Sequence, residues 1–259
     1  MPETVLVGLA EWKLPVAGVD AVDLAARLEV DGLQVDLGGT GRGPRLDMPA
    51  RWRALRAAAK NAGIELLAVT ANCLNDIGFH LADRVAEVQS VVLRLLDAAY
   101  NLNAPLAFIP SFRRSAMTDT ETRRRTIDLL AWACGHAEER DLLLANENVL
   151  APKAAAELVS GVGSHAFRLI FDTGNLVQAK IDVQTLLATV GARIADQIHF
   201  KEHESPGSAV ACLDVLAKSG FRIGAVVLEN DYRTEGTTQL VTDIQAARNL
   251  AKKLTQEPS

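Results

Sequence analysis

The chain has 259 residues, 49% of them hydrophobic, which is enough to bury the core of one large α/β domain or of two smaller ones. Its formal net charge of −5 provides no broad cationic surface, so nucleic acid is a poor default partner. The first apolar run is too short for a secretory signal, and no later stretch is long enough to span a bilayer, so we expect a cytoplasmic protein.

The cysteines give no sign of a disulfide framework or a zinc ribbon. Cys73, Cys134 and Cys212 are odd in number, widely spaced and without a CxxC pair. We expect reduced and mostly buried thiols.

Short runs rich in Val, Ile and Leu alternate with longer amphipathic stretches along the whole chain, with no internal linker. The expected strands are Val5–Trp12, Gly32–Gly38, Glu65–Asn72, Leu106–Ser111, Leu142–Val149, Arg168–Asn175, Ile194–Lys201 and Ala225–Asp231. The expected helices include Val19–Glu29, Pro49–Ala62, Leu81–Leu102, Glu121–Arg140 and Val183–Val190. Eight such units predict a single (β/α)₈ barrel over residues 1–259, with a doubly wound sheet as the competing architecture.

Four of these strands carry a buried-type polar residue near the carboxyl end. Glu147 interrupts LLLANENVLAP, Asp172 lies in RLIFDTGN, His199 in DQIHFKE and Glu229 in VVLENDY. Their separations of 172−147 = 25, 199−172 = 27 and 229−199 = 30 residues are close to the ~31 residues of one βα unit. This repeat favours a barrel, whose strand ends converge at one mouth, over an open sheet.

Three carboxylates cannot converge in a narrow mouth without a compensating charge, so we expect one divalent cation there. Three oxygen ligands and one imidazole suit Mn²⁺, Mg²⁺, Co²⁺ or Zn²⁺ and select weakly among them. Taken singly, each of the four residues is more often a helix cap, an ion-pair partner or a packed rim residue. Their repeating phase is what favours a metal site.

The motifs ANENV, FDTGN, IHFKE and LENDY resemble those of the sugar-phosphate isomerase/epimerase superfamily, the xylose isomerase-like TIM barrels that include tagatose-type 3-epimerases, hydroxypyruvate isomerases and inosose dehydratases. The resemblance implies that Glu147, Asp172, His199 and Glu229 bind one divalent metal, and that Glu147 and Glu229 also act as acid and base. It is strongest from about residue 140 onward. The substrate does not follow from it.

The resemblance implies proton abstraction next to a carbonyl, through an enediolate, in a small sugar, polyol or hydroxy-keto acid. Return of the proton to the opposite face gives epimerisation, and return to the adjacent carbon gives isomerisation. Loss of a β-hydroxyl gives a dehydratase, which is the alternative function. A non-catalytic sugar-binding barrel is a further alternative. A homo-oligomer is compatible with the sequence.

Further residues are candidates for substrate contact. Asn175 stands where many relatives have histidine, and Lys201 shares a strand face with His199 or forms a rim salt bridge to Glu202 or Glu204. Trp12 and His80 would wall the pocket, with core packing as the simpler role. Four arginines in the mouth loops would clamp a phosphate or carboxylate, or carry surface charge: Arg42, Arg45, Arg113 and Arg114.

A zinc-dependent endonuclease of the same superfamily is disfavoured. Such enzymes use a multinuclear cluster with several histidines, whereas His136 and His165 fall in a helix and a helix–strand loop of this acidic chain.

Overall fold

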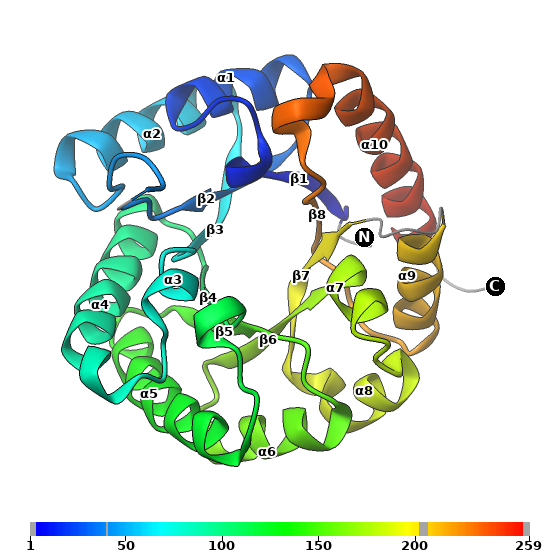
Figure 1. Ribbon diagram of the computed structural model, residues 1–259. Coiled ribbons are helices and arrows are strands. Elements are labelled where there is room, and N and C mark those ends of the chain that lie inside the picture. The colour runs from blue at the N-terminus through cyan, green and yellow to red at the C-terminus, as the bar shows by residue number, and fades with distance from the viewer. Residues whose placement is uncertain (1–3, 40, 202–206, 256–259) are drawn as a thin grey trace.

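In the computed structural model, which describes residues 4–39, 41–201 and 207–255, eight strands form a closed parallel barrel surrounded by helices (Figure 1). The strands are β1 (Leu6–Ala10), β2 (Gly32–Asp36), β3 (Glu65–Thr70), β4 (Leu106–Pro110), β5 (Leu143–Glu147), β6 (Phe167–Asp172), β7 (Ile194–Phe200) and β8 (Ala225–Leu228). Pairing of β1 with β8 closes the sheet, so the predicted barrel is confirmed and the doubly wound sheet is wrong.

The outer layer consists of helices that follow the strands. These are α1 (Val19–Arg27), α2 (Pro49–Ala62), α4 (Val85–Leu102), α5 (Thr120–Glu138), α6 (Pro152–Val162), α8 (Val183–Val190), α9 (Ser208–Lys218) and α10 (Tyr232–Thr255). Shorter pieces are α3 (Leu74–Ile77), α7 (Thr173–Gln178) and the 3₁₀ turns η1 (Glu11–Lys13), η2 (Ala82–Arg84), η3 (Arg113–Ser115) and η4 (Gly191–Arg193). None of the helices in the described ranges combines the length and the apolar character needed to cross a bilayer.

All eight predicted strands extend one to three residues past the carboxyl ends that the structure shows. Trp12 lies in the 3₁₀ turn η1 rather than at the end of β1, and Asn175 lies in α7 rather than in β6. The second difference has a local cause, because the Asp172 side chain accepts a hydrogen bond from the Asn175 backbone N–H and so caps α7. The chain therefore turns into a helix directly after Asp172.

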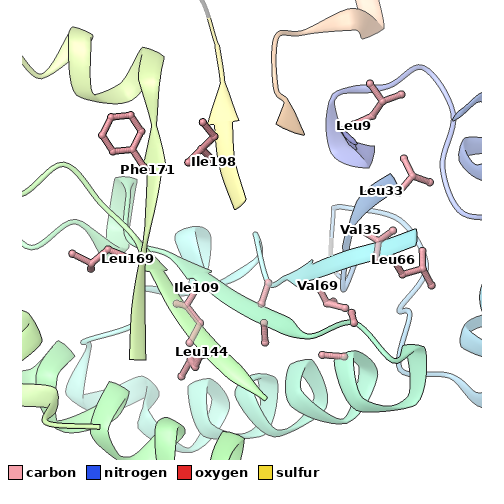
Figure 2. Packing of buried hydrophobic residues seen from close by; sticks show 14 of the residues in the cluster. Leu9, Leu33, Val35, Leu66, Val69, Ile109, Leu144, Leu169, Phe171 and Ile198 are labelled. Atoms are coloured by element: carbon pink, nitrogen blue, oxygen red, sulfur yellow. The ribbon is translucent and has the colours of Figure 1, made fainter. Parts of the chain in front are cut away.

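Hydrophobic residues fill the space between the barrel and its helices. Alternate strand residues such as Leu9, Leu33, Ile109, Leu144 and Ile198 point outward into this layer (Figure 2). A second set of buried side chains has no helical members and fills the inside of the barrel: Ala10, Leu67, Ala68, Leu106, Phe108, Ala145, Ile170, Ala195, Ala225 and Val227. The barrel interior is therefore packed below its mouth.

Two glycines make room for one large interior side chain. A Cβ atom on Gly8 or on Gly32 would lie 2.7 Å from a carbon of the Leu67 side chain. Because cores tolerate overpacking poorly, β1 and β2 carry glycine where Leu67 enters from β3.

Candidate metal centre

The structure brings the four predicted residues together. One ligand atom from each of Glu147, Asp172, His199 and Glu229 lies within 4.8 Å of the others, and all four side chains are buried. Glu147 and Asp172 are the last residues of β5 and β6, His199 is the penultimate residue of β7, and Glu229 directly follows β8. The cluster thus lies at the C-terminal mouth, where TIM barrels place their reacting groups.

The four residues are not all paired with one another across neighbouring strands, so they do not lie at one common position along the strand ladder. Asp172 pairs with His199 across β6 and β7, whereas Glu147 pairs with Ile170 across β5 and β6. Strands in a closed barrel are staggered, so residues of one cluster occupy different ladder positions.

His199 lies at the centre of the cluster. Its Nδ1 atom is 3.3 Å from Glu229 Oε2, 3.7 Å from Glu147 Oε1 and 3.8 Å from Asp172 Oδ2. Its Nε2 atom is 2.8 Å from Gln34 Oε1, on the opposite side of the ring. One ring nitrogen therefore faces three carboxylates, and the other faces a side-chain amide.

Burial and mutual charge shift the pKa values of the cluster. Burial, together with the neighbouring Glu229 and Glu147, raises the pKa of Asp172 to about 7. Although burial opposes its charged form, the three carboxylates raise the pKa of His199 well above its usual value. Burial also opposes ionisation of Glu229, but His199 and Lys201 hold the pKa of Glu229 below its usual range. A positive charge placed among the three buried carboxylates would therefore stabilise the cluster.

The donor set fits a divalent cation. His199 Nδ1 and Glu229 Oε2 are buried and have no hydrogen-bond partner among the described residues, a costly state that a bound cation would relieve. Ligands on opposite sides of a first-row divalent ion lie about 4.2 Å apart, so the 4.8 Å spread of the four atoms needs only a small contraction. Three oxygens and one nitrogen do not decide which ion is preferred.

Two predicted substrate contacts instead support the cluster in this structure. Trp12 Nε1 donates to Glu229 Oε1 at 2.9 Å. Asn175 Nδ2 lies 2.9 Å from both Glu147 Oε1 and Asp172 Oδ2 and donates to them. Both residues therefore fix carboxylates of the cluster, whatever they also do to a substrate.

Lys201 lies at the edge of the cluster. Its ammonium donates to Asn175 Oδ1 at 3.3 Å and lies 3.9 Å from Glu229 Oε2. Although burial opposes its charge, Glu229, Asp172 and Glu147 raise the pKa of Lys201 above its usual value. The alternative partners Glu202 and Glu204, like the neighbouring His203, lie outside the described residues.

His80 does not join the cluster. It is buried beside Ser115, and its charged neighbours are Asp119 and Arg125. Burial lowers the pKa of His80. Its place in the structure gives no support to substrate contact.

The four arginines of the mouth loops are already engaged. Arg42 and Arg113 form ion pairs with Asp76, and Arg45 pairs with Asp47. Arg114 donates to the backbone carbonyl of Asp76. Arg42 also lines a cavity of about 280 Å³ beside Trp12, together with Asp36 and Arg233.

Sequence reasoning missed two glutamines inside the barrel. Gln34 on β2 contacts His199, and Gln34 Nε2 donates to Gln197 Oε1 at 3.1 Å. Gln197 Nε2 in turn donates to the Leu67 carbonyl oxygen at 2.8 Å. A signal was present, since Gln197 lies two residues before His199 and thus on the same strand face.

Comparison with known proteins agrees with this architecture. The family model described as "Xylose isomerase-like TIM barrel" matches residues 22–254. A curated 2-epi-5-epi-valiolone 7-phosphate 2-epimerase from Actinoplanes sp. is 45% identical over 259 residues, which cover 96% of this chain and 95% of the relative.

Solved structures of similar shape share little sequence with the chain. D-psicose 3-epimerase from Clostridium cellulolyticum H10 has a TM-score of 0.74 at 15% identity, covering 97% of this chain and 100% of that one. The 3-keto-D-glucoside 4-epimerase from E. coli has a TM-score of 0.74 at 15% identity, covering 95% and 99%. At this identity they show the fold alone.

Proposed function

The chain belongs to the xylose isomerase-like TIM barrel family and is an enzyme of the isomerase and epimerase class, and from this premise we propose that it is a divalent-metal-dependent epimerase of a phosphorylated polyhydroxy ketone. The observation that carries the proposal is the convergence of four buried side chains at the ends of β5 to β8, two of which have a buried atom without a hydrogen-bond partner in the described part of the chain. The match to the curated relative covers 96% of this chain at 45% identity and supports the same chemistry.

Glu147, Asp172, His199 and Glu229 would hold the cation. When bound, a divalent ion there supplies Lewis-acid polarisation of a substrate carbonyl, which acidifies the neighbouring C–H bond. The ion is Mn²⁺, Mg²⁺, Co²⁺ or Zn²⁺.

Glu147 and Glu229 are the proposed acid and base. They extend from β5 and β8, three strand positions apart in the ring, so their carboxylates enter the mouth from different directions. One carboxylate removes the proton from the carbon next to the carbonyl, and the other returns a proton to the opposite face. This two-sided arrangement inverts one stereocentre.

Lys201 and Asn175 are the proposed contacts for the substrate oxygens. The Lys201 ammonium lies within 4 Å of both Asn175 and Glu229, and the side chain is 28% exposed, so it can reach a ligand in the mouth. There it would stabilise the negative charge left on a substrate oxygen after proton removal. Asn175 would hold Lys201 and a substrate hydroxyl through one amide.

We place the phosphate of the substrate at the cavity beside Trp12. Arg42 and Arg233 line this cavity, and Trp12 also contacts Glu229, so a substrate could extend from the cluster to the two guanidinium groups. Arginine binds phosphate through paired N–H donors. Arg42 already pairs with Asp76, and Arg233 pairs with Asp231. A bound phosphate would compete with these carboxylates for the two guanidinium groups.

Proton exchange tests the proposal directly. The curated relative is named for 2-epi-5-epi-valiolone 7-phosphate, so this compound is the first substrate to incubate in D₂O with Mn²⁺-loaded protein. We expect deuterium at the carbon next to the carbonyl, with formation of the 2-epimer, by NMR. Chelator treatment should stop the exchange, and Mn²⁺ should restore it.

Other results would change the assignment. A product lighter by one water would indicate the dehydratase alternative. Absence of exchange with this substrate and with its dephosphorylated form would contradict the epimerase assignment for this class of ketone. We also retain as predictions a cytoplasmic location and a homo-oligomer.

A further inference from the structure

A chain of buried amides inside the barrel connects His199 to the backbone. His199 Nε2 meets Gln34 Oε1 at 2.8 Å, Gln34 Nε2 donates to Gln197 Oε1 at 3.1 Å, and Gln197 Nε2 donates to the Leu67 carbonyl oxygen at 2.8 Å. Gln34 and His199 are fully buried, and Gln197 is nearly so. The chain links β7 to β2, returns to β7 and ends on β3.

The last acceptor fixes the direction of every bond in this chain. A backbone carbonyl oxygen can only accept, so Gln197 must present its amino group to Leu67 and its oxygen to Gln34. Gln34 must then present its amino group to Gln197 and its oxygen to His199. Rotating either amide by half a turn would place donor against donor or acceptor against acceptor in a buried site.

The direction of the chain decides which nitrogen of His199 carries hydrogen. Gln34 Oε1 only accepts, so His199 Nε2 must be the N–H donor. The lone pair of a neutral imidazole is then on Nδ1, the atom that faces Glu147, Asp172 and Glu229 and has no hydrogen bond to any described residue. Metal-binding histidines generally depend on such a partner for tautomer and ring orientation.

We propose that Gln34 and Gln197 are positioning residues that hold His199 in the Nε2–H tautomer with Nδ1 directed at a divalent cation. This inference rests on the metal site of the proposed function. Within the described part of the chain, neither glutamine hydrogen-bonds to a carboxylate of the cluster, so both act through His199. Gln34 contacts the imidazole, and Gln197 keeps the Gln34 amide from rotating.

The test compares Mn²⁺ affinity, measured by calorimetry on chelator-treated protein, between two substitutions at one position. Gln34→Leu removes the acceptor for His199 Nε2–H and should weaken Mn²⁺ binding about 10- to 100-fold. Gln34→Glu, as a neutral carboxylic acid, keeps an acceptor for His199 Nε2–H and a donor for Gln197 Oε1, and should retain affinity within about threefold of wild type. A purely structural role predicts that both variants, once folded, bind Mn²⁺ as tightly as wild type does.

Gln197→Leu frees the Gln34 amide to rotate, so its Mn²⁺ affinity should fall between that of wild type and Gln34→Leu. Thr126→Val is the matched control, since it removes a buried hydroxyl from α5, outside the barrel, and should leave affinity unchanged. With ¹⁵N-labelled histidine and Zn²⁺, wild type should show a proton on His199 Nε2 and a metal-shifted Nδ1. Gln34→Leu should lose this signature.

The outcomes separate the two proposals. If wild type binds no Mn²⁺, the metal site and the positioning role both fail. If wild type binds Mn²⁺ and Gln34→Leu binds it equally well, only the positioning role fails.

Discussion

Trp12 and Glu229, 217 residues apart in the chain, are joined by a 2.9 Å hydrogen bond from the indole N–H to Oε1. The same indole ring packs against Phe108 and His199, with ring centroids 5.9 Å and 6.3 Å away. Glu229 Oε1 is thereby engaged, and Oε2 is the oxygen that faces His199. Trp12, which was expected to line the pocket, therefore also orients the carboxylate of Glu229, a proposed catalytic residue.

Trp12→Phe tests this role, because phenylalanine preserves most of the ring packing and removes the N–H donor. A hydrogen bond to a charged group contributes about 1.5–3 kcal/mol, so kcat/KM should fall roughly 10- to 100-fold. The rate of deuterium incorporation into the substrate measures the effect. Trp132→Phe, on α5 beside His136, is the control and should leave this rate unchanged. An unaltered rate in Trp12→Phe would remove its positioning role.

Glu147→Gln and Glu229→Gln should each abolish turnover while leaving the barrel folded. Each change is nearly isosteric, but Glu229→Gln also removes the carboxylate paired with His199 and Lys201, so it should lower the free energy of unfolding more than Glu147→Gln does. Circular dichroism and thermal unfolding report the fold, and NMR reports the exchange. Near-normal exchange in either variant would end its assignment as acid or base.

Mn²⁺ should stabilise the chelator-treated protein. At one hundred times Kd, binding adds about 2.7 kcal/mol, which corresponds to a rise in Tm of about 5–10 °C for a domain of this size. His199→Ala removes the only nitrogen ligand of the cluster and should weaken Mn²⁺ affinity more than about 100-fold. A wild-type Tm that does not respond to Mn²⁺, Mg²⁺, Co²⁺ or Zn²⁺ would favour the non-catalytic barrel.

Arg42→Ala and Arg233→Ala should separate recognition of phosphate from chemistry. If these guanidiniums bind the phosphate, each variant should raise KM about tenfold for the phosphorylated ketone and leave KM for its dephosphorylated form unchanged. Arg45→Ala, whose partner is Asp47, serves as a control from the same loop as Arg42. Equal effects on both substrates would place the phosphate elsewhere.

The thiols should react slowly with an added disulfide reagent in the folded protein. Burial raises the pKa of Cys73 to about 11 and that of Cys134 to about 12. At pH 8 the reactive thiolate of Cys73 is then only about one part in a thousand. Ellman's reagent should therefore react slowly at pH 8 and rapidly with all three cysteines after unfolding in guanidinium. Stoichiometric reaction of the native protein within minutes would contradict the burial of Cys134 and the partial burial of Cys73.

The sequence predicted the barrel because its signals are local and repeat. Each strand is a short apolar run, and the polar residue at the end of four of them recurs at nearly the length of one βα unit, so Glu147, Asp172, His199 and Glu229 could be assigned together. Element ends were less predictable. The strand expected to include Asn175 stops at Asp172 because one side chain caps the next helix, a contact that hydrophobic pattern does not encode.

Contacts across the barrel lie beyond such signals. The partner of Gln34 is 165 residues away at His199, and nothing in GLQVD indicates which interior group its amide meets. The contact of Trp12 with Glu229 likewise becomes evident only when β1 and β8 are placed side by side. Pairs of this kind depend on closure and stagger of the strands, which only the folded barrel defines.

Residues from the first half of the barrel hold residues of the cluster from the second half, which limits how this protein can be joined to other barrels in a chimera. Trp12 follows β1 and Gln34 lies on β2, whereas Glu229 and His199, the residues that they hold, follow β8 and lie on β7. A chimera that joins its front half to the rear half of a distant barrel would inherit donors and acceptors that were never selected as pairs. Such a hybrid would fold with the Glu229 carboxylate and the His199 imidazole in the wrong orientation. Exchange of half-barrels therefore succeeds only when both members of each pair, Trp12 with Glu229 and Gln34 with His199, are kept.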